Sequence, residues 1–392
     1  MARARTISTR PEPERACLVT VGVRGRDGPL ALGESLDELA HLAASAGAVV
    51  VSRFSQMLPK PSRTYLGSGK IDELKEAIKR DSIDVVIFDD ELHPTQQRAL
   101  EDALHTKVID RSGLILDVFA ARARTREGKL QTDLAQSEHL LPRLAGQWSH
   151  LERLGGGIGT RGPGEAQIET DRRLVRTKIA RLKRELEQVR QQRARQRRNR
   201  ARGETRIVDL VGYTNAGKSA LFNRLTAATV LVKNQLFSTL DPTTRRIHLP
   251  SGDSAVITDT VGFIHKLPTI VVAAFRATLE ELREADILLH VVDASSPLAP
   301  QHAMVVDKIL RDLELSDIPR ILVLNKIDLV PGGFDGQLPE WATGSLGVQK
   351  AVFTSAVTGT GIEALRLAID EELRGGVVAF DAAANGRSQI DH

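Results

Sequence analysis

Cysteine is almost absent from this sequence, and long apolar runs are absent altogether. The single cysteine, Cys17, excludes an internal disulfide framework and any metal site built from cysteines. No apolar run reaches the roughly 18–20 residues of a membrane-spanning helix, so we expect no membrane association. The arginine-rich start lacks the apolar core of a signal peptide and contains Glu12 and Glu14. We therefore expect a cytoplasmic protein with disordered tails over residues 1–17 and 374–392.

Net charge is also small, but it is unevenly distributed. The formal net charge of the 392 residues is +4. Between Asp171 and Arg206, fifteen Lys and Arg stand against four Asp and Glu, so this segment carries +11 and the remainder −7. Concentrated positive charge of this kind indicates contact with a polyanion such as RNA, although a solvated helix face has the same composition.

One segment fits the phosphate-binding loop pattern G-x-x-x-x-G-K-[ST] at every fixed position. An apolar segment (206–211) precedes it and a segment with helical spacing (220–225) follows it, which predicts a strand, a turn and a helix. Backbone N–H groups at such a turn bind phosphates, Lys218 can reach the β- and γ-phosphates, and Ser219 can ligate Mg²⁺. The predicted loop consists of Gly212, Tyr213, Thr214, Asn215, Ala216, Gly217, Lys218 and Ser219.

Guanine is the base that the rest of the sequence favours. The pattern N-K-x-D follows the apolar run 321–324, at Asn325, Lys326, Ile327 and Asp328. The Asp328 carboxylate can accept hydrogen bonds from guanine N1–H and the 2-amino group, whereas adenine offers neither donor. A second loop at the base is expected at Ser355, Ala356 and Val357.

A fourth element lies between the phosphate loop and the N-K-x-D segment, at Asp259, Thr260, Val261 and Gly262. Asp259 can hold Mg²⁺ through a water molecule, and the Gly262 N–H can meet the γ-phosphate. Four elements in this order, each at the end of a predicted strand, indicate a GTPase domain over residues 203–373 that binds GTP and GDP.

The N-terminal part predicts a separate α/β domain over residues 18–112. Predicted strands at 18–23, 48–51 and 85–88 alternate with predicted helices at 35–46, 71–80 and 94–104, which is typical of a parallel sheet. Ser35 is the candidate N-cap of the first helix, and Gly47 is its stop. The segment 67–70 does not complete a second phosphate loop, and we expect a glycine turn before a helix there.

Residues 113–202 predict a long helical hairpin. Apolar residues from Val175 to Val189 recur in steps of four and three, and this a/d seam needs a partner helix such as the one expected around Leu130 and Leu134. The tip, 155–164, contains six glycines and a proline and cannot be helical. It is either a flexible spacer or a tip whose backbone approaches RNA closely. The predicted fold class is therefore α/β, an N-terminal α/β domain with a long helical hairpin followed by a Ras-like P-loop GTPase domain.

Taken together, these segments resemble the HflX-type GTPases. The resemblance covers about residues 18–373 and extends to the segments 65–70, 108–111, 155–173, 237–246 and 259–264. It implies a protein, expected to be a monomer, that binds the large ribosomal subunit and splits stalled or idle ribosomes in its GTP-bound state. The residues alone leave open a GTP-gated RNA chaperone or ribosome assembly factor without splitting activity. The expected rRNA contacts are Gly156, Gly157, Arg161, Gly162, Arg190, Arg193, Arg195, Arg197 and Arg198.

The resemblance also bears on the catalytic centre. It implies nucleotide contacts from the switch I residues Phe237, Ser238, Thr239, Leu240 and Asp241. Three threonines there are candidates for the second Mg²⁺ ligand, and the resemblance favours Thr239, with Thr243 as the alternative. Phe263 stands where Ras-like enzymes have a water-orienting glutamine, so Lys218, Gly262 and Asn215 are the expected catalytic groups. Asn215 either binds K⁺ near the phosphates, as in similar GTPases, or is a simple turn residue.

Overall fold

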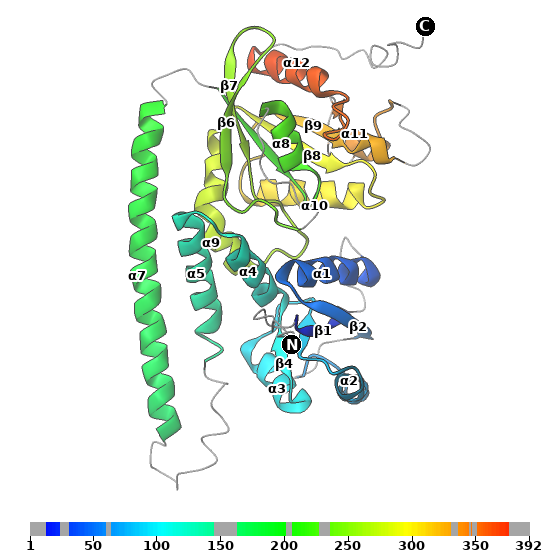
Figure 1. Ribbon diagram of the computed structural model, residues 1–392, viewed down its shortest axis with the longest axis vertical. Coiled ribbons are helices and arrows are strands. Elements are labelled where there is room, and N and C mark those ends of the chain that lie inside the picture. Colours follow the sequence, from blue (N-terminus) through cyan, green and yellow to red (C-terminus); the bar gives the residue numbers. More distant parts are fainter. Residues whose placement is uncertain are drawn as a thin grey trace, which may run out of the picture. The chain divides into compact units, whose positions relative to one another are not determined.

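The computed structural model describes residues 13–23, 31–59, 64–144, 163–200, 206–226, 236–330, 336–344, 346 and 351–375. The chain divides into two compact units, the first formed by residues 1–118 and 139–175 and the second by residues 119–138 and 176–392 (Figure 1). Most of both predicted tails lies outside the described residues. The expected N-terminal tail is too long, however, because the first strand begins at Arg15. No described helix is long and apolar enough to span a membrane.

The first unit contains a four-stranded sheet in the order β2-β1-β3-β4, with every neighbouring pair parallel. The strands are β1 (Arg15–Val23), β2 (Val49–Leu58), β3 (Val85–Phe88) and β4 (Lys107–Ile109), and the helices between them are α1 (Leu32–Ala46), α2 (Ser68–Asp81) and α3 (Pro94–Leu104). The predicted parallel sheet with helical crossovers is confirmed.

The ends of α1 show what local sequence can and cannot specify. Gly47 ends the helix in the left-handed conformation with φ of 93°, as predicted for a glycine stop. The prediction of Ser35 as N-cap is wrong, because the helix begins three residues earlier, after Ala31. Ser35 is instead buried and donates a hydrogen bond of 2.6 Å to Asp89 after β3. A tertiary partner therefore explains this serine better than a capping role does.

The hairpin segment contains α4 (Arg111–Arg122), α5 (Arg126–Leu140) and α7 (Pro163–Arg200). Its residues divide between the two units. Residues 155–162 of the expected tip lie outside the described part of the chain. The prediction that the whole tip is not helical is wrong at its end, because α7 begins at Pro163, and proline is well suited to the first turn of a helix. In the second unit, α5 and α7 run antiparallel, with Leu134 packed against Leu182 and Leu186. Ion pairs flank this seam, between Arg126 and Glu185 at 3.8 Å and between Lys178 and Asp133 at 3.6 Å.

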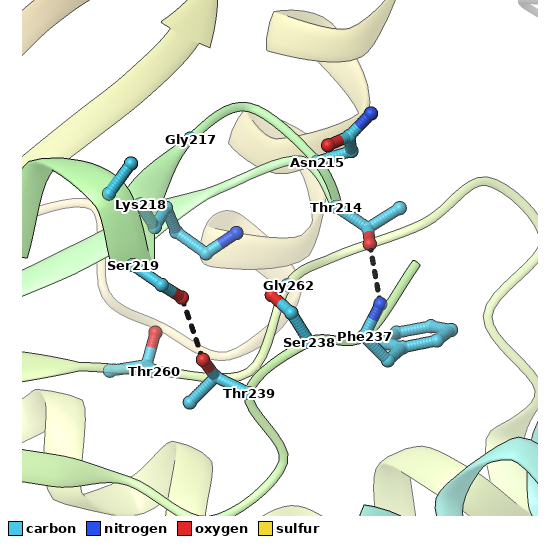
Figure 2. A pocket seen from close by; sticks show the side chains of 11 residues that line it. Thr214, Asn215, Gly217, Lys218, Ser219, Phe237, Ser238, Thr239, Thr260 and Gly262 are labelled. Atoms are coloured by element: carbon cyan, nitrogen blue, oxygen red, sulfur yellow. Dashed lines mark hydrogen bonds between the residues drawn. The ribbon is translucent and has the colours of Figure 1, made fainter. Parts of the chain in front are cut away.

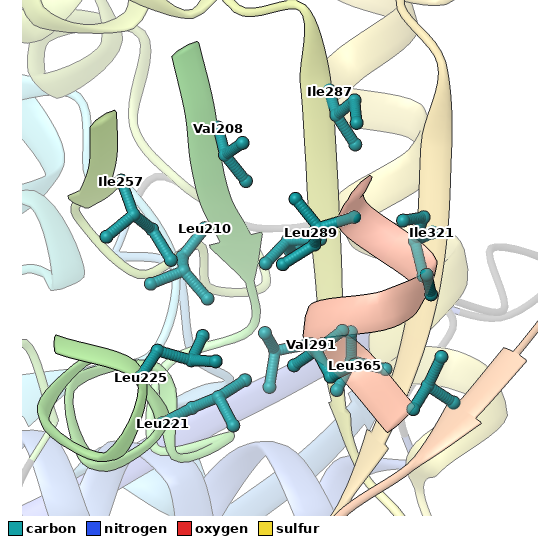
Figure 3. Close-up of a cluster of buried hydrophobic side chains, with 14 of the residues drawn as sticks. Val208, Leu210, Leu221, Leu225, Ile257, Ile287, Leu289, Val291, Ile321 and Leu365 are labelled. Atoms are coloured by element: carbon teal, nitrogen blue, oxygen red, sulfur yellow. The ribbon is translucent and has the colours of Figure 1, made fainter. Parts of the chain in front are cut away.

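The second unit also contains a six-stranded sheet in the order β10-β9-β8-β5-β7-β6, in which only β6 is antiparallel to its neighbour. Leu221 and Leu225 of one helix and Leu365 of another pack over strand residues such as Val208 and Leu289 (Figure 3). The strands are β5 (Arg206–Gly212), β6 (Thr243–His248), β7 (Ser254–Asp259), β8 (Ile287–Asp293), β9 (Arg320–Asn325) and β10 (Ala351–Phe353). The helices are α8 (Lys218–Thr226), α9 (Thr269–Glu280), α10 (Ala299–Asp312), α11 (Glu340–Gly344) and α12 (Ile362–Leu373).

The predicted fold class is thus confirmed, and the sheet fixes where a ligand can bind. The carboxyl ends of the parallel strands β5, β7, β9 and β10 meet at one edge of the sheet. Ligands of open α/β sheets bind in the loops at this edge.

His290 lies in the middle of this sheet and is 2% exposed. Burial, and next the nearby Arg320 guanidinium, lower its pKa from 6.5 to about 4. A pKa that is lower in the folded than in the unfolded state contributes stability that is complete above pH 6.5 and is lost as the pH falls towards 4. The contribution is roughly 3 kcal/mol, because one pKa unit corresponds to about 1.4 kcal/mol.

We therefore expect His290→Leu to flatten the loss of unfolding free energy between pH 6.5 and 4, whatever its effect at neutral pH. Urea unfolding followed by the fluorescence of Trp341, with Trp148 replaced by Phe, measures the unfolding free energy of the domain that contains the six-stranded sheet. His248→Leu removes an exposed histidine of the same sheet and should leave the pH dependence as it is. Equal pH dependence in His290→Leu and the parent protein would show that His290 does not cause this loss of unfolding free energy.

Candidate functional site

The loop between β5 and α8 is closed by a side chain from β9. Asn325 Nδ2 donates a hydrogen bond of 3.0 Å to the Ala216 carbonyl. Gly217 has φ of 94°, and a Cβ added there would lie 2.3 Å from the same Nδ2, so this position requires glycine. Asn215 also has positive φ, 63°, a conformation that asparagine tolerates. The predicted strand, turn and helix are present, with α8 beginning at Lys218.

A pocket opens directly in front of this loop (Figure 2). Lys218 is buried in it, and its Nζ donates to the carbonyls of Gly212 and Tyr213 at 3.1 and 2.9 Å. Burial lowers the pKa of Lys218 to about 8, against the opposing effect of Asp259. An ammonium group with so little solvation is suited to bind phosphate oxygens. The residues that line the pocket are Thr214, Asn215, Gly217, Lys218, Ser219, Ala220, Phe237, Ser238, Thr239, Thr260 and Gly262.

Three oxygen-bearing side chains meet at one side of the pocket. Asp259 Oδ2 accepts hydrogen bonds from Ser219 Oγ at 2.6 Å and from Thr239 Oγ1 at 2.7 Å, and the two hydroxyl oxygens are 2.7 Å apart. Burial raises the pKa of Asp259, although these two hydrogen bonds oppose the shift. Its other oxygen, Oδ1, is buried and has no hydrogen-bond partner among the residues that the structure describes. Hard oxygen donors with a free carboxylate lone pair are the ligands that Mg²⁺ prefers, so these residues fit the ion.

Thr243, the alternative ligand, is placed differently. It begins β6 and pairs with the backbone of β7 rather than lining the pocket. Of the two candidates, the structure brings Thr239 to Ser219 and Asp259.

The segment after Asp259 is hydrogen-bonded to the phosphate loop through the backbone of Phe263. Phe263 N–H donates to the Gly212 carbonyl at 3.1 Å, and its carbonyl accepts from Thr214 N–H at 2.7 Å. A Cβ on Gly262 would lie 2.9 Å from Thr214 Cα, so the two segments approach closely. The Phe263 side chain is 2% exposed. A buried phenyl ring cannot orient a water molecule for attack.

At the other end of the site, Asn325 connects the loops after β9 and β10. Its Oδ1 accepts hydrogen bonds from Ala356 N–H at 3.1 Å and from Thr354 Oγ1 at 3.3 Å. Lys326 forms an ion pair of 2.6 Å with Asp293 at the end of β8. Asp328 is exposed in a short 3₁₀ turn, Ile327–Leu329, and Val357 is 78% exposed. The predicted guanine-contacting residues therefore lie on two neighbouring loops.

The predicted switch I residues divide into two groups. Phe237, Ser238 and Thr239 line the pocket, and Phe237 N–H donates to Thr214 Oγ1 at 2.9 Å. Leu240 is buried, and Asp241 is not among the lining residues. The Asp241 carboxylate instead contacts the start of α5, a partner that no local sequence signal predicts.

The predicted RNA-contacting residues are only partly visible. Gly156, Gly157, Arg161 and Gly162 lie outside the described residues. The arginines predicted from Arg190 onwards all lie on α7, and Arg190 is exposed, 4.0 Å from Glu187. The side chains of the later ones are not described.

Comparison with known proteins places most of the chain among GTP-binding GTPases. Three family models match it, described as GTP-binding GTPase N-terminal (residues 33–120), GTP-binding GTPase Middle Region (122–200) and 50S ribosome-binding GTPase (207–326). The chain is similar to GTPase HflX from Alkalihalophilus pseudofirmus, with 49% identity over 348 residues covering 88% of this chain and 80% of the relative. GTPase HflX from Escherichia coli is 48% identical over 346 residues, with the same coverage of 88% and 80%.

Among solved structures, a crystal structure of the protein SsGBP in complex with GDP matches with a TM-score of 0.50. It is 24% identical, and the match covers 93% of this chain and 100% of that chain. At this identity the likeness concerns the fold alone.

Asp328→Asn should change the base preference of the site from guanine to xanthine. A carboxamide can donate to the 2-oxygen of xanthine but no longer accepts from both guanine donors, so the affinity for GTP should fall at least about a hundredfold. Competition binding of GTP against xanthosine triphosphate measures the exchange. A variant that still prefers GTP would show that Asp328 does not contact the base.

Proposed function

The chain belongs to the HflX family of GTPases, and we propose that it binds the large ribosomal subunit and splits stalled or idle ribosomes in its GTP-bound state. Hydrolysis of GTP to GDP and phosphate then ends the cycle. The observation that carries the proposal is the match of residues 207–326, which contain the pocket, to a family of 50S ribosome-binding GTPases. We further propose that the protein acts in the cytoplasm as a monomer.

The charge of α7 supports a ribosomal RNA partner. Leu182 and Leu186 bury the apolar stripe of this helix against α5, which leaves Arg181 and Arg184 exposed. The segment from Asp171 to Arg206 carries +11 while the remainder of the chain carries −7. Since RNA repels the rest of the surface, this helix is the part suited to contact it, and binding should weaken with salt. The glycine-rich tip, 155–164, is the proposed contact deep in the subunit.

We propose that the pocket performs phosphoryl transfer mainly by positioning and by stabilising charge. Ser219 and Thr239 would ligate Mg²⁺ directly and Asp259 through water, and the ion when bound neutralises charge on the phosphates. Lys218 would contact the β- and γ-phosphates, and the Gly262 N–H would donate to the γ-phosphate. Asn215, at the mouth of the loop, is the proposed K⁺ ligand. None of the described residues that line this pocket is a glutamine that could replace Phe263, so the ribosome is the expected activator.

Hydrolysis should accordingly be slow for the protein alone and at least about tenfold faster with large subunits, as expected where a partner completes a GTPase site. Turnover is to be measured with and without large subunits, in K⁺ and in Na⁺. A turnover rate that is higher in K⁺ than in Na⁺, with the difference lost in Asn215→Ala, would support the cation site. Equal rates in both salts would show that Asn215 is only a turn residue. Equal rates with and without subunits would rule out ribosomal activation.

Splitting itself is tested by sedimentation of intact ribosomes with the protein and a non-hydrolysable GTP analogue. We expect conversion into free subunits, with the protein on the large one, and no conversion with GDP. Lys218→Ala, which removes the phosphate-binding ammonium, is the control and should leave ribosomes intact. Binding to the large subunit without conversion would favour the alternative of a GTP-gated assembly factor or RNA chaperone.

A further inference from the structure

The proposed metal ligand Thr239 is flanked on both sides by contacts with the segment 119–128. On one side, the Phe237 ring packs edge-on against Phe119, with ring centroids 4.7 Å apart at 90°, and Phe119 packs in the same way against Phe275 at 4.9 Å. Phe119 and Phe237 are each 1% exposed. This aromatic cluster fixes the chain two residues before Thr239.

On the other side, Asp241 binds the two residues that precede α5. Its Oδ2 accepts hydrogen bonds of 2.8 Å from the N–H groups of both Arg124 and Thr125, and its Oδ1 accepts from Thr125 Oγ1. Thr125 is the N-cap of α5, because its Oγ1 accepts from Gly128 N–H at 3.0 Å and its carbonyl accepts from Lys129 N–H at 3.1 Å. A carboxylate beside the N-cap also complements the helix dipole.

Gly128 makes this arrangement possible. It is buried in the first turn of α5, and a Cβ added there would lie 2.3 Å from Asp241 Oδ1. Any larger side chain would displace the carboxylate. The absence of a side chain at this helical position, which costs helix stability relative to alanine, is therefore explained by room for Asp241.

We propose that Asp241 is a positioning residue that couples α5 to the nucleotide pocket. By binding Arg124 and the N-cap residue Thr125, it fixes switch I two residues after Thr239, so that Thr239 Oγ1 stays beside Ser219 and Asp259. Contacts to the γ-phosphate and its Mg²⁺ order switch I in GTPases, and hydrolysis releases it. The hydrogen bonds of Asp241 therefore form more firmly in the GTP state than in the GDP state.

Coupling of this kind is reciprocal, so whatever orders α5 also favours GTP over GDP. Because α5 packs on α7 through Leu134, Leu182 and Leu186, the nucleotide state reaches the arginine-covered helix by this path. The inference depends on GTP binding and on the assignment of Thr239, and not on any action at the ribosome. All of its tests use the protein without ribosomes.

The first test compares the affinities for GDP and for a non-hydrolysable GTP analogue in Mg²⁺. Asp241→Ala should weaken binding of the analogue about five- to tenfold, the net effect of about one lost hydrogen bond, and change GDP affinity less than twofold. Asp241→Asn keeps an oxygen for the two N–H groups and should retain the parent ratio. Asp253→Ala, an exposed aspartate of the β6–β7 turn, is the matched control.

Gly128→Ala should have the same effect as Asp241→Ala, although alanine favours helices. Its control is Gly69→Ala in the first turn of α2, where a Cβ meets nothing within 4 Å. Equal loss in both glycine variants, or a parent-like affinity ratio in Asp241→Ala, would overturn the proposal.

The second test is amide hydrogen exchange at Arg124 and Thr125, the N–H groups that Asp241 accepts from. In the parent protein the GTP analogue should slow their exchange relative to GDP, and in Asp241→Ala this nucleotide dependence should vanish. If Asp241 only stabilised the fold, Asp241→Ala would lower the melting temperature while exchange at both amides stayed independent of nucleotide in the parent protein. That outcome would also overturn the proposal.

Discussion

The Asp259 carboxylate is the point on which the site depends. It ends β7, and one of its oxygens accepts from Ser219 at the start of α8 and from Thr239 of switch I. Three segments that are distant in sequence are thereby held within hydrogen-bond distance of each other. Burying a carboxylate is costly unless its lone pairs are satisfied, and Oδ1, which no described residue contacts by a hydrogen bond, is the atom proposed to accept from a metal-bound water. Substituting this residue would separate the phosphate loop from the switch as well as remove a charge.

From this point the contacts lead outwards in one direction. Thr239 is followed by Asp241, Asp241 binds the N-cap residue of α5, and α5 packs its leucines against the basic helix α7. Each step is a directional hydrogen bond or a buried apolar contact, so a small change at the γ-phosphate can alter the contacts of α7. In this proposal the hairpin is part of the switch rather than a passive RNA-binding arm.

The sequence predicted those features whose information is local. The phosphate loop, the N-K-x-D segment and the glycine stop at Gly47 each depend on residue types within a few positions, and each lies on the predicted element. The a/d seam of α7 also predicted its partner helix around Leu130 and Leu134, but polar contacts between residues distant in sequence could not be predicted. Ser35 is bound by Asp89 rather than by its own helix, Thr239 and Thr243 could not be separated by spacing, and Asp241 meets Thr125 across 116 residues. The site was thus predictable as a set of loops, whereas the connection between the loops and the hairpin was not.

The coupling between the nucleotide pocket and the hairpin is tested most directly by the distance between α7 and the nucleotide-binding domain in each nucleotide state. Cys17 is the single cysteine of the chain and is buried. Once it is replaced by Ser, cysteines introduced at the exposed Gln188 and Asp312 can be spin-labelled selectively. Coupling through Asp241 and α5 predicts a narrow distribution of label distances with the GTP analogue and a broader or shifted one with GDP. Identical distributions in both states would contradict it, because the nucleotide would then have no influence on the hairpin.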